Sequence, residues 1–210
     1  MTLEAIRHAA AARQLAVMGV VHDELPQGVA SLVLLGPLEP GFWDTFTAAP
    51  EYGDGQPDPL DRWSARVVGD LSTELGVQAF FPFGSPPYQP FTRWAVASGR
   101  AHSSPVGLFV HDEAGLWLSY RGALGLAERI DVPPPSPSPC DSCDDKPCLT
   151  ACPVDAFATG TYDVAGCKTD LDRPGNDCLT RGCPVRRACP VGQRHGRVEA
   201  QSAFHMRAFR

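Results

Sequence analysis

The sequence predicts an α+β protein, in which a mixed helix-and-strand domain is followed by a smaller module rich in cysteine. Three observations lead to this class. Apolar residues repeat with helical spacing in some segments of the N-terminal part and form short strand-like runs in others. One pair of runs flanks a short polar loop, as in an antiparallel hairpin. The sequence also lacks the glycine-rich loops of doubly wound nucleotide-binding domains, which argues against that class.

Three helices are expected in the first domain, over residues 3–14, 59–75 and 90–98. The clearest pattern belongs to 59–75, whose apolar residues fall on one helical face. They are Leu60, Trp63, Val67, Val68, Leu71 and Leu75. Asp58 is expected to cap the start of this helix, and Gly76 follows its end, so both boundaries carry typical signals.

Strands are expected between these helices. Short apolar runs predict buried strands over residues 16–21, 31–36 and 78–83. Two further runs, 106–110 and 116–120, flank a five-residue polar loop that ends in glycine. This pattern predicts a β-hairpin and therefore at least one antiparallel strand pair.

A proline-rich segment divides the sequence. Proline restricts the backbone and favours an extended, semi-rigid spacer. We therefore expect an α+β domain over residues 1–132, a linker over 133–139 and a cysteine-rich module over 140–210. With 210 residues, an apolar fraction of 43% and a charged fraction of 20%, the chain is long enough and apolar enough to fold.

Composition and charge exclude several functional classes. No apolar stretch approaches the ~18 residues of a membrane span. The first residues lack the pattern of a secretory signal, so we expect a cytoplasmic protein with no membrane partner. The formal net charge is −6. The basic cluster near the C-terminus is interleaved with cysteines and lacks stacking aromatic residues, so no nucleic-acid partner is expected.

The cysteines are the candidate functional residues, and all of them lie in the C-terminal module. They are Cys140, Cys143, Cys148, Cys152, Cys167, Cys178, Cys183 and Cys189. In a reducing compartment such a concentration of cysteine indicates metal binding. A [4Fe–4S] cluster takes four thiolates, and closely spaced cysteines in a turn-rich loop supply several of them. Eight thiolates therefore match two [4Fe–4S] clusters.

Three alternatives use the same residues differently. Two zinc ions would also take eight thiolates, but zinc sites are typically built from Cys-x2-Cys pairs, and only Cys140 and Cys143 form one. Disulfides would more often be distributed across the elements that they join, and they need an oxidising compartment. A single cluster with spare cysteines is the third alternative. The two-cluster interpretation accounts best for the number and the spacing.

The cysteine pattern resembles that of a known family. The run Cys140-x2-Cys143-x4-Cys148-x3-Cys152-Pro153, the lone Cys167 after Tyr162-Asp163, and a closing group that ends in Cys189-Pro190 are similar to the C-terminal module of epoxyqueuosine reductases. The segments Gly107-Leu108, Gly115-Leu116-Trp117 and Gly122-Ala123-Leu124 precede the cysteines much as paired strands do in that family. The resemblance implies a ferredoxin-like module with two [4Fe–4S] clusters. It also implies that the first domain is a shortened relative of the nitroreductase-like fold of these reductases and of cobalamin-processing proteins.

The resemblance also implies how the cysteines divide between the clusters. In the two-cluster pattern, the cysteine that precedes a proline crosses to the other cluster. On this basis one cluster takes Cys140, Cys143, Cys148 and Cys189. The other cluster takes Cys152, Cys167, Cys178 and Cys183.

The leading functional hypothesis is an electron-transfer protein that passes single electrons through its two clusters to or from a redox partner protein. The second hypothesis is a small corrinoid- or flavin-dependent reductase, in which the clusters supply electrons to a cofactor held by the first domain. The third is structural, with the clusters only holding the C-terminal module together. No side chain is assigned a catalytic role, because no nucleophile–base pair is evident in the sequence.

Overall fold

The computed structural model describes residues 1–158 and 161–210, and it divides into two compact units. Unit 1 consists of residues 1–100 and 119–136, and unit 2 of residues 101–118 and 137–210. The segment 101–118, which we placed in the first domain, therefore belongs with the cysteines. Part of the predicted linker packs on unit 1, since Ser136 N–H donates a hydrogen bond of 3.3 Å to the carbonyl of Gly99.

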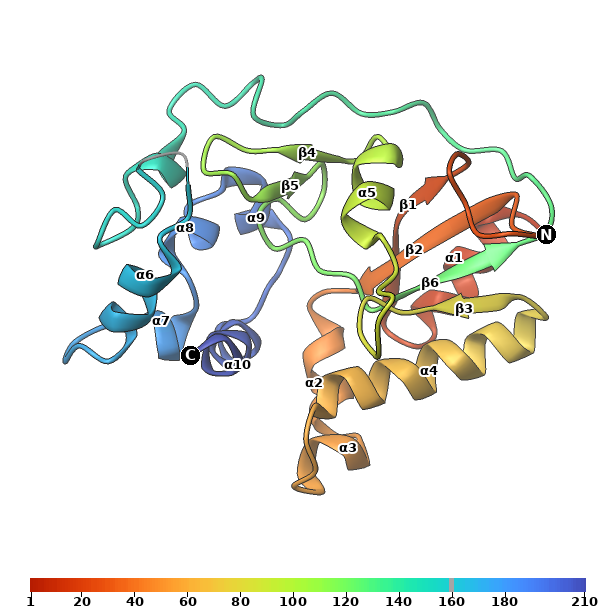
Figure 1. Cartoon of the computed structure of the whole chain (residues 1–210), viewed down its shortest axis with the longest axis horizontal. Coiled ribbons are helices and arrows are strands. Elements are labelled where there is room, and N and C mark those ends of the chain that lie inside the picture. Colours follow the sequence, from red (N-terminus) through yellow and green to blue (C-terminus); the bar gives the residue numbers. More distant parts are fainter. Residues whose placement is uncertain (159–160) are drawn as a thin grey trace. The chain divides into compact units, whose positions relative to one another are not determined.

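Unit 1 is a four-stranded antiparallel sheet covered by helices (Figure 1). Its strand order is β1-β2-β6-β3. The strands are β1 (Leu15–Val21), β2 (Ser31–Pro37), β3 (Gln78–Phe80) and β6 (Gly122–Leu126). The helices are α1 (Leu3–Ala11), α2 (Gly41–Thr47), α3 (Pro50–Gly53), α4 (Pro59–Leu75) and α5 (Phe91–Ala97). The predicted helices and strands of this unit are thus confirmed, with ends that differ by a few residues.

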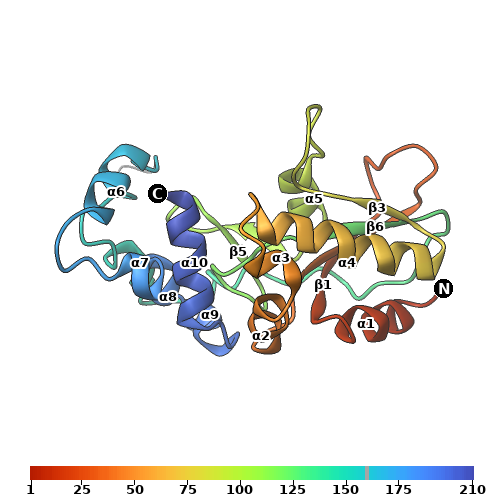
Figure 2. The ribbon, with the colours of Figure 1, turned by 90° about the horizontal axis from the view of Figure 1, so that it is seen from below.

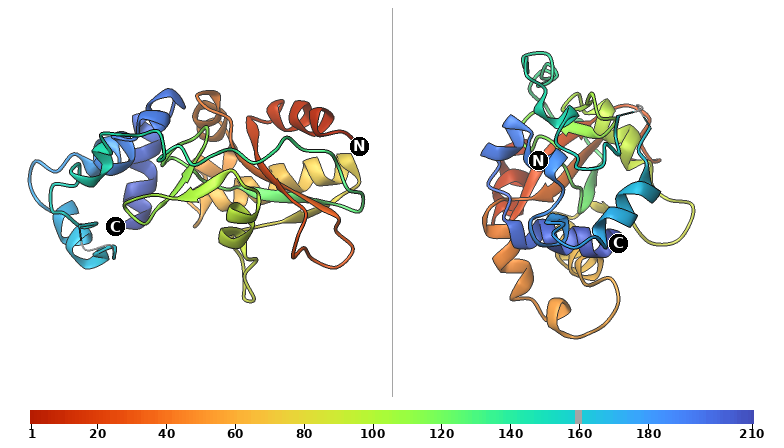
Figure 3. Two further views of the ribbon diagram at one scale, coloured as in Figure 1. Left: turned by 90° about the horizontal axis from the view of Figure 1, so that it is seen from above. Right: turned by 90° about the vertical axis from the view of Figure 1, so that its left-hand side faces the viewer.

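The central strand β2 is buried along its whole length because both faces of the sheet are covered. Side chains alternate between the faces of a strand. Leu32 and Leu34 pack with Phe91 and Trp94 of α5 on one face. On β6, a β-carbon at Gly122 would lie 3.0 Å from Val68 of α4, which identifies α4 as a cover of the opposite face. Figures 2 and 3 show α1 and α5 on opposite sides of the sheet.

Helix α4 has the predicted bounds, but its start differs from the prediction. Asp58 adopts a left-handed conformation and makes no side-chain hydrogen bond to the helix, so it is not the expected cap. Pro59 occupies the first helical position, where its missing N–H costs nothing. At the other end Gly76 has a φ of 65° and its N–H bonds to the last carbonyls, as glycine does at many helix ends.

The predicted hairpin of residues 106–110 and 116–120 is wrong. The structure pairs β4 (Ala101–Ser103) with β5 (Phe109–His111), and the turn lies over residues 104–108. Residues 116–118 are not a strand. Leu116 is instead buried in the core of unit 2, so packing against the cysteine-rich segment, which periodicity does not reveal, decides its conformation.

The rest of unit 2 consists of short helices and turns. They are η1 (Pro147–Leu149), α6 (Val164–Leu171), α7 (Cys178–Arg181), α8 (Pro184–Arg187), α9 (Pro190–Arg194) and α10 (Glu199–Phe209). Helix α10 packs on α7 (Figure 2). The unit's core joins hairpin residues such as Val110 to Phe157, Val185 and the cysteines themselves.

The described strands pair only in antiparallel fashion and lie beside segregated helices, which makes the protein α+β as predicted. None of the helices in residues 1–158 and 161–210 has both the length and the apolar character needed to cross a membrane.

Candidate metal centre

Proline residues place several of the cysteines at the ends of short helical turns. Cys148 lies in the 3₁₀ turn that begins at Pro147. Cys189 directly precedes Pro190, the first residue of α9, and its carbonyl accepts the N–H of Gln193 at 2.9 Å. Proline suits a first helical position, so it fixes where each turn starts. The thiols are therefore held on defined turns of backbone.

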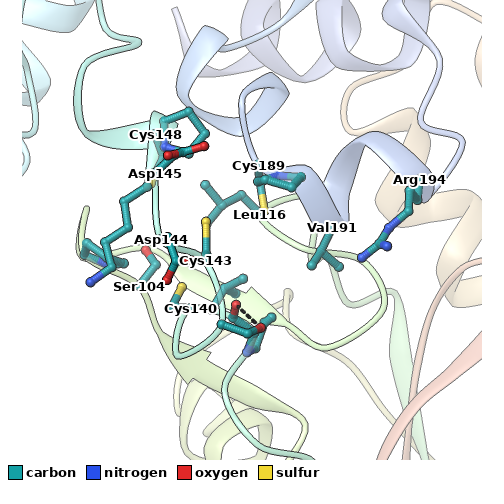
Figure 4. A pocket seen from close by; sticks show the side chains of 17 residues that line it. Ser104, Leu116, Cys140, Cys143, Asp144, Asp145, Cys148, Cys189, Val191 and Arg194 are labelled. Atoms are coloured by element: carbon teal, nitrogen blue, oxygen red, sulfur yellow. Dashed lines mark hydrogen bonds between the residues drawn. The ribbon is translucent and has the colours of Figure 1, made fainter.

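Four cysteines line one hollow of unit 2, which has a volume of about 390 Å³. We call them the first cysteine group. They are Cys140, Cys143, Cys148 and Cys189. Figure 4 shows the sulfur atoms of Cys140, Cys143 and Cys189 facing the same space. Three of the four come from a single loop and turn, whereas Cys189 comes from a much later segment of the chain, at the start of α9.

The wall of this hollow is apolar on the hairpin side and charged at its mouth. Val110 and Leu116 line it together with the cysteines. Four exposed charged residues also line it, namely Asp144, Asp145, Lys146 and Arg194 (Figure 4). The hollow is thus shielded by packed side chains on one side and open to water on the other.

The backbone at Gly115 packs so closely against α9 and Cys189 that no side-chain atom fits at this position. Gly115, after the hairpin, has a φ of 57°, and a β-carbon there would lie 2.4 Å from the backbone nitrogen of Gly192 and 2.9 Å from the Cys189 sulfur. The indole of Trp117 contacts Gly192, and the guanidinium of Arg197 lies 5.4 Å from the centre of that ring. These contacts fix α9 and therefore Cys189 against the hairpin.

The thiols of the first group influence one another electrostatically. Burial raises the pKa of Cys140 and of Cys148 above that of a free cysteine. The charges of Cys143 and Cys189 raise both values further. Four thiolates at this spacing would repel each other in the free protein, so a bound cationic centre is what would stabilise them in the deprotonated form.

The other four cysteines form a second group. They are Cys152, Cys167, Cys178 and Cys183. Burial raises the pKa of Cys167, and the charges of Cys183 and Cys152 add to this. Burial likewise raises the pKa of Cys178 to about 11, with Cys183 as the next cause. Cys183 is thus within electrostatic reach of both Cys167 and Cys178, and Cys152 is within reach of Cys167.

Hydrogen bonds position the members of the second group. The Ala156 N–H donates to the Cys152 sulfur at 3.4 Å. Tyr162 is hydrogen-bonded to Cys167, and its ring stacks on Phe157 with centroids 4.5 Å apart. Burial and this hydrogen bond raise the pKa of Tyr162, so its hydroxyl stays protonated. The sulfur atoms of Cys152 and Cys167 therefore each have a hydrogen-bond partner, and the aromatic rings of Tyr162 and Phe157 pack beside them.

A third contact orients Cys178 at the start of α7. Its N–H donates to Asn176 Oδ1 at 2.8 Å, and the amide of Asn176 in turn donates to Asp170 at 2.5 Å. Sequence reasoning did not identify Asn176 or Tyr162 as site residues. Tyr162 was noticed only as a neighbour of Cys167, and a polar residue two positions before Cys178 carries no distinguishing signal.

The first set of four that the resemblance implies lines one hollow, and in the second set Cys183 acts on both Cys167 and Cys178. Cys152 lies with Cys167 and Cys183 although it follows Cys148 by only four residues. All eight are free thiols, with no disulfide. Their binding of a metal remains a prediction.

A single zinc ion would require the four thiolates of a group to come close together. Four thiolates on one zinc, with bonds of about 2.3 Å, converge to within roughly 4 Å of each other. Among the described residues, no group of three or more His, Cys, Asp or Glu side chains is arranged to hold such an ion.

Unit 1 contains a separate, shallow hollow of about 460 Å³ between α2 and α4. Trp63 lines it, and so do Arg13 and Arg66. Both arginines are already paired, Arg13 with Glu74 and Arg66 with Glu51. Neither is therefore an uncompensated cation for an anionic cofactor.

Comparison with known proteins adds no relative: no protein-family model matches the chain, and no curated protein or solved structure shows significant similarity to it.

Proposed function

We propose that this protein binds two [4Fe–4S] clusters, one at each cysteine group, and transfers single electrons through them. The observation that carries the proposal is that four free thiols line one hollow of unit 2 while the other four lie in the same small unit. Each group combines one stretch of chain with a distant cysteine, Cys189 in the first and Cys152 in the second. Such crossing is the ligation pattern of two-cluster ferredoxins.

Several features favour clusters over zinc ions. The first group surrounds a hollow of about 390 Å³. An iron–sulfur cubane is larger than a single ion and holds its four thiolates around its own bulk. The apolar wall of Val110 and Leu116 would keep water from one side of the centre, which is one of the means by which proteins set cluster potentials.

The clusters would supply reversible one-electron chemistry, and the chain's residues would hold them and limit the access of water. In this proposal the exposed mouth beside Asp144 and Asp145 lets a redox partner protein approach the first group. The free state of all eight thiols agrees with a reducing compartment, so we infer a cytoplasmic location.

Metal analysis combined with spectroscopy tests the proposal. Protein reconstituted anaerobically with iron and sulfide should contain about eight irons and eight acid-labile sulfides per chain. A broad visible absorption should bleach with dithionite, and electron paramagnetic resonance (EPR) should show reduced cubanes. Tightly bound zinc without sulfide would overturn the proposal.

The second candidate is a small reductase in which the clusters supply electrons to a corrinoid or flavin on unit 1. Unit 1 is a folded unit with its own core and its own hollow, and a simple electron carrier does not require it. The same purified sample distinguishes the candidates. Sharp corrin or flavin bands beside the cluster absorption favour the reductase, and cluster absorption alone favours the electron carrier.

A further inference from the structure

We propose that the hydroxyl of Ser104 donates a hydrogen bond to a sulfur atom of the centre bound by the first cysteine group, and thereby raises the reduction potential of that centre. The inference rests on the proposed function. It assigns a role to a residue that lies outside the cysteine pattern, in the hairpin that precedes the proline-rich segment.

Ser104 lies in the turn between β4 and β5 and lines the hollow of the first cysteine group (Figure 4). Only 8% of the residue is exposed. Its N–H donates to the carbonyl of Leu108 at 2.9 Å, and its carbonyl accepts the N–H of Gly107 at 2.9 Å. Pro105, the next residue, restricts the backbone of Ser104 further. The backbone that carries this side chain is therefore fixed at the wall of the hollow.

The hydroxyl of Ser104 lacks a partner in the protein. Within residues 1–158 and 161–210, no group forms a hydrogen bond with its buried Oγ. Both backbone groups of the residue are satisfied, so the unmet hydrogen bond concerns the hydroxyl alone. A buried hydroxyl without a hydrogen bond destabilises the folded protein, and in native structures such a group normally has a ligand, an ion or a water as its partner.

The surroundings favour sulfur over water as that partner. An ordered buried water needs several polar partners of its own. Val110 and Leu116, which line the same hollow, are apolar and buried. The first cysteine group brings its sulfur atoms to this hollow, and hydrogen bonds to sulfur are one of the means by which proteins set the potential of an iron–sulfur centre. The unsatisfied donor thus fits a cubane held by these cysteines.

The charges around the hollow do not replace this influence. Two acidic residues, Asp144 and Asp145, and two basic residues, Lys146 and Arg194, line it, so their formal charges cancel. All four are exposed, and solvent screens exposed charges more than buried groups. A buried hydrogen-bond donor in the wall is therefore the polar group that we expect to affect the first centre most.

The step that this hydrogen bond affects is the addition of one electron to the first centre from a low-potential donor such as dithionite. No covalent bond forms or breaks, and the hydroxyl keeps its proton. The added electron makes the sulfur atoms more negative, so a hydrogen-bond donor stabilises the reduced state more than the oxidised state. Loss of the hydroxyl should therefore lower the reduction potential.

EPR-monitored redox titration of the full chain tests this role. Replacing Cys178 with alanine first leaves only the first centre to be observed, and replacements of Ser104 are compared in that background. For Ser104→Ala the equilibrium constant for reduction should fall about tenfold, which for a one-electron couple is about 59 mV toward negative potential. Ser104→Thr keeps the hydroxyl and should stay close to the parent. Ser104→Val has the shape of threonine without the hydroxyl and should shift as Ser104→Ala does.

Ser142 provides a matched control at the same hollow. It is exposed, and its hydroxyl already donates to the carbonyl of Pro139, at 3.5 Å (Figure 4). Ser142→Ala should therefore leave the potential unchanged. A shift as large as that of Ser104→Ala would show that the effect is not specific to the buried hydroxyl and would overturn the inference.

Iron is counted in every variant, and potentials are compared at equal iron content. If Ser104→Ala and Ser104→Val keep both their iron and the parent's potential, the hydroxyl does not contact the centre and the inference is wrong. If both lose the centre while Ser104→Thr retains it, the hydroxyl is needed to hold the centre, which supports the contact. If Ser104→Thr loses its iron or shifts as far as Ser104→Val, shape is the cause and the inference is wrong. If the protein with all of its cysteines binds no iron and sulfide, the proposed function itself fails.

Discussion

The candidate site depends on individual glycines as well as on its cysteines. At Gly115 the hairpin end passes so close to α9 that the backbone nitrogen of Gly192 would lie 2.4 Å from a β-carbon. The conformation is also left-handed, with a φ of 57°. Both facts require glycine, since a side chain would have to push α9 and Cys189 away.

Gly115→Ala should therefore destabilise unit 2 more than a glycine replacement in open space. Gly107, in the turn of the same hairpin, has a φ of 74°, and a β-carbon there would have no atom within 4 Å, so Gly107→Ala serves as the control. Both variants incur the cost of a left-handed conformation, about 1–2 kcal/mol. Gly115→Ala adds overpacking, about 1–3 kcal/mol. Urea unfolding of the two iron-loaded variants measures the difference, and equal stabilities would contradict the close contact.

Among the site residues, the cysteines could be found from the sequence and their supporting contacts could not. Cysteines that bind metal recur in the sequence with characteristic spacings. All cysteines of the chain lie between Cys140 and Cys189, and packing alone does not account for this concentration. Tyr162 and Asn176 are ordinary residue types at unremarkable positions. Their roles depend on which side chains the fold brings beside them, and only the structure supplies that information.

Among the helices and strands, sequence patterns correctly predicted the elements that local interactions stabilise. They failed for the segment whose conformation is decided by contacts with distant parts of the chain. Helix α4 has the predicted bounds because a wide apolar face, Pro59 and Gly76 all agree. The predicted hairpin failed because its two apolar runs do not pair. Leu116 instead packs with Cys148 and Val185, which lie beyond the proline-rich segment and far along the chain.

Leu116→Ala tests this revised packing. Leu116 is 1% exposed, so removing its side chain should leave a cavity and lower the free energy of unfolding of unit 2 by about 2–5 kcal/mol. The same replacement at Leu149, which is 47% exposed, should change it by no more than about 0.5 kcal/mol. Similar losses in the two variants would show that Leu116 is not a core residue.

The contact between α3 and α4 predicts a pH-dependent contribution to the stability of unit 1. Arg66 donates two hydrogen bonds to Glu51, at 2.5 and 3.0 Å, and these lower the pKa of the buried Glu51. Because the pKa of Glu51 is lower in the folded protein than in the unfolded chain, the ion pair stabilises the folded state fully at a pH above the unfolded pKa, which is about 4.3. This stabilisation is lost as the pH falls through the pKa of Glu51 in the folded protein.

Glu51→Gln should therefore be less stable than the parent at pH 7, by about 1 kcal/mol, and the difference should shrink toward pH 3. Tryptophan fluorescence during urea unfolding measures it, because Trp43, Trp63 and Trp94 report on unit 1. Glu74→Gln breaks the more exposed pair with Arg13 and should have a smaller effect at pH 7. A difference that stays constant from pH 7 to pH 3 would contradict the assigned cause.

At the scale of the whole molecule, the two units differ in what holds them together. Unit 1 has an extensive apolar core around its sheet, whereas the core of unit 2 includes cysteines among its few buried apolar residues. A core this small gives little stability by itself, so bound clusters should contribute folding free energy.

Cluster removal should accordingly have unequal effects on the two units. After treatment with a chelator and an oxidant, limited proteolysis should cut residues 137–210 rapidly, while residues 1–100 stay protected. Mass spectrometry of the fragments locates the cuts, and the untreated holoprotein is the control. Equal resistance of both units after complete iron loss would show that unit 2 does not depend on its clusters.

The central claim is that the eight thiols form two independent four-ligand sites, and iron content in paired cysteine replacements tests it most directly. Cys140→Ala with Cys189→Ala removes two ligands of the first group, so about four irons should remain, as in either single variant. Cys140→Ala with Cys178→Ala removes one ligand from each group and should leave almost none. If the first pair loses all of its iron while the second pair keeps about half, Cys140 and Cys189 serve different centres and the proposed division is wrong.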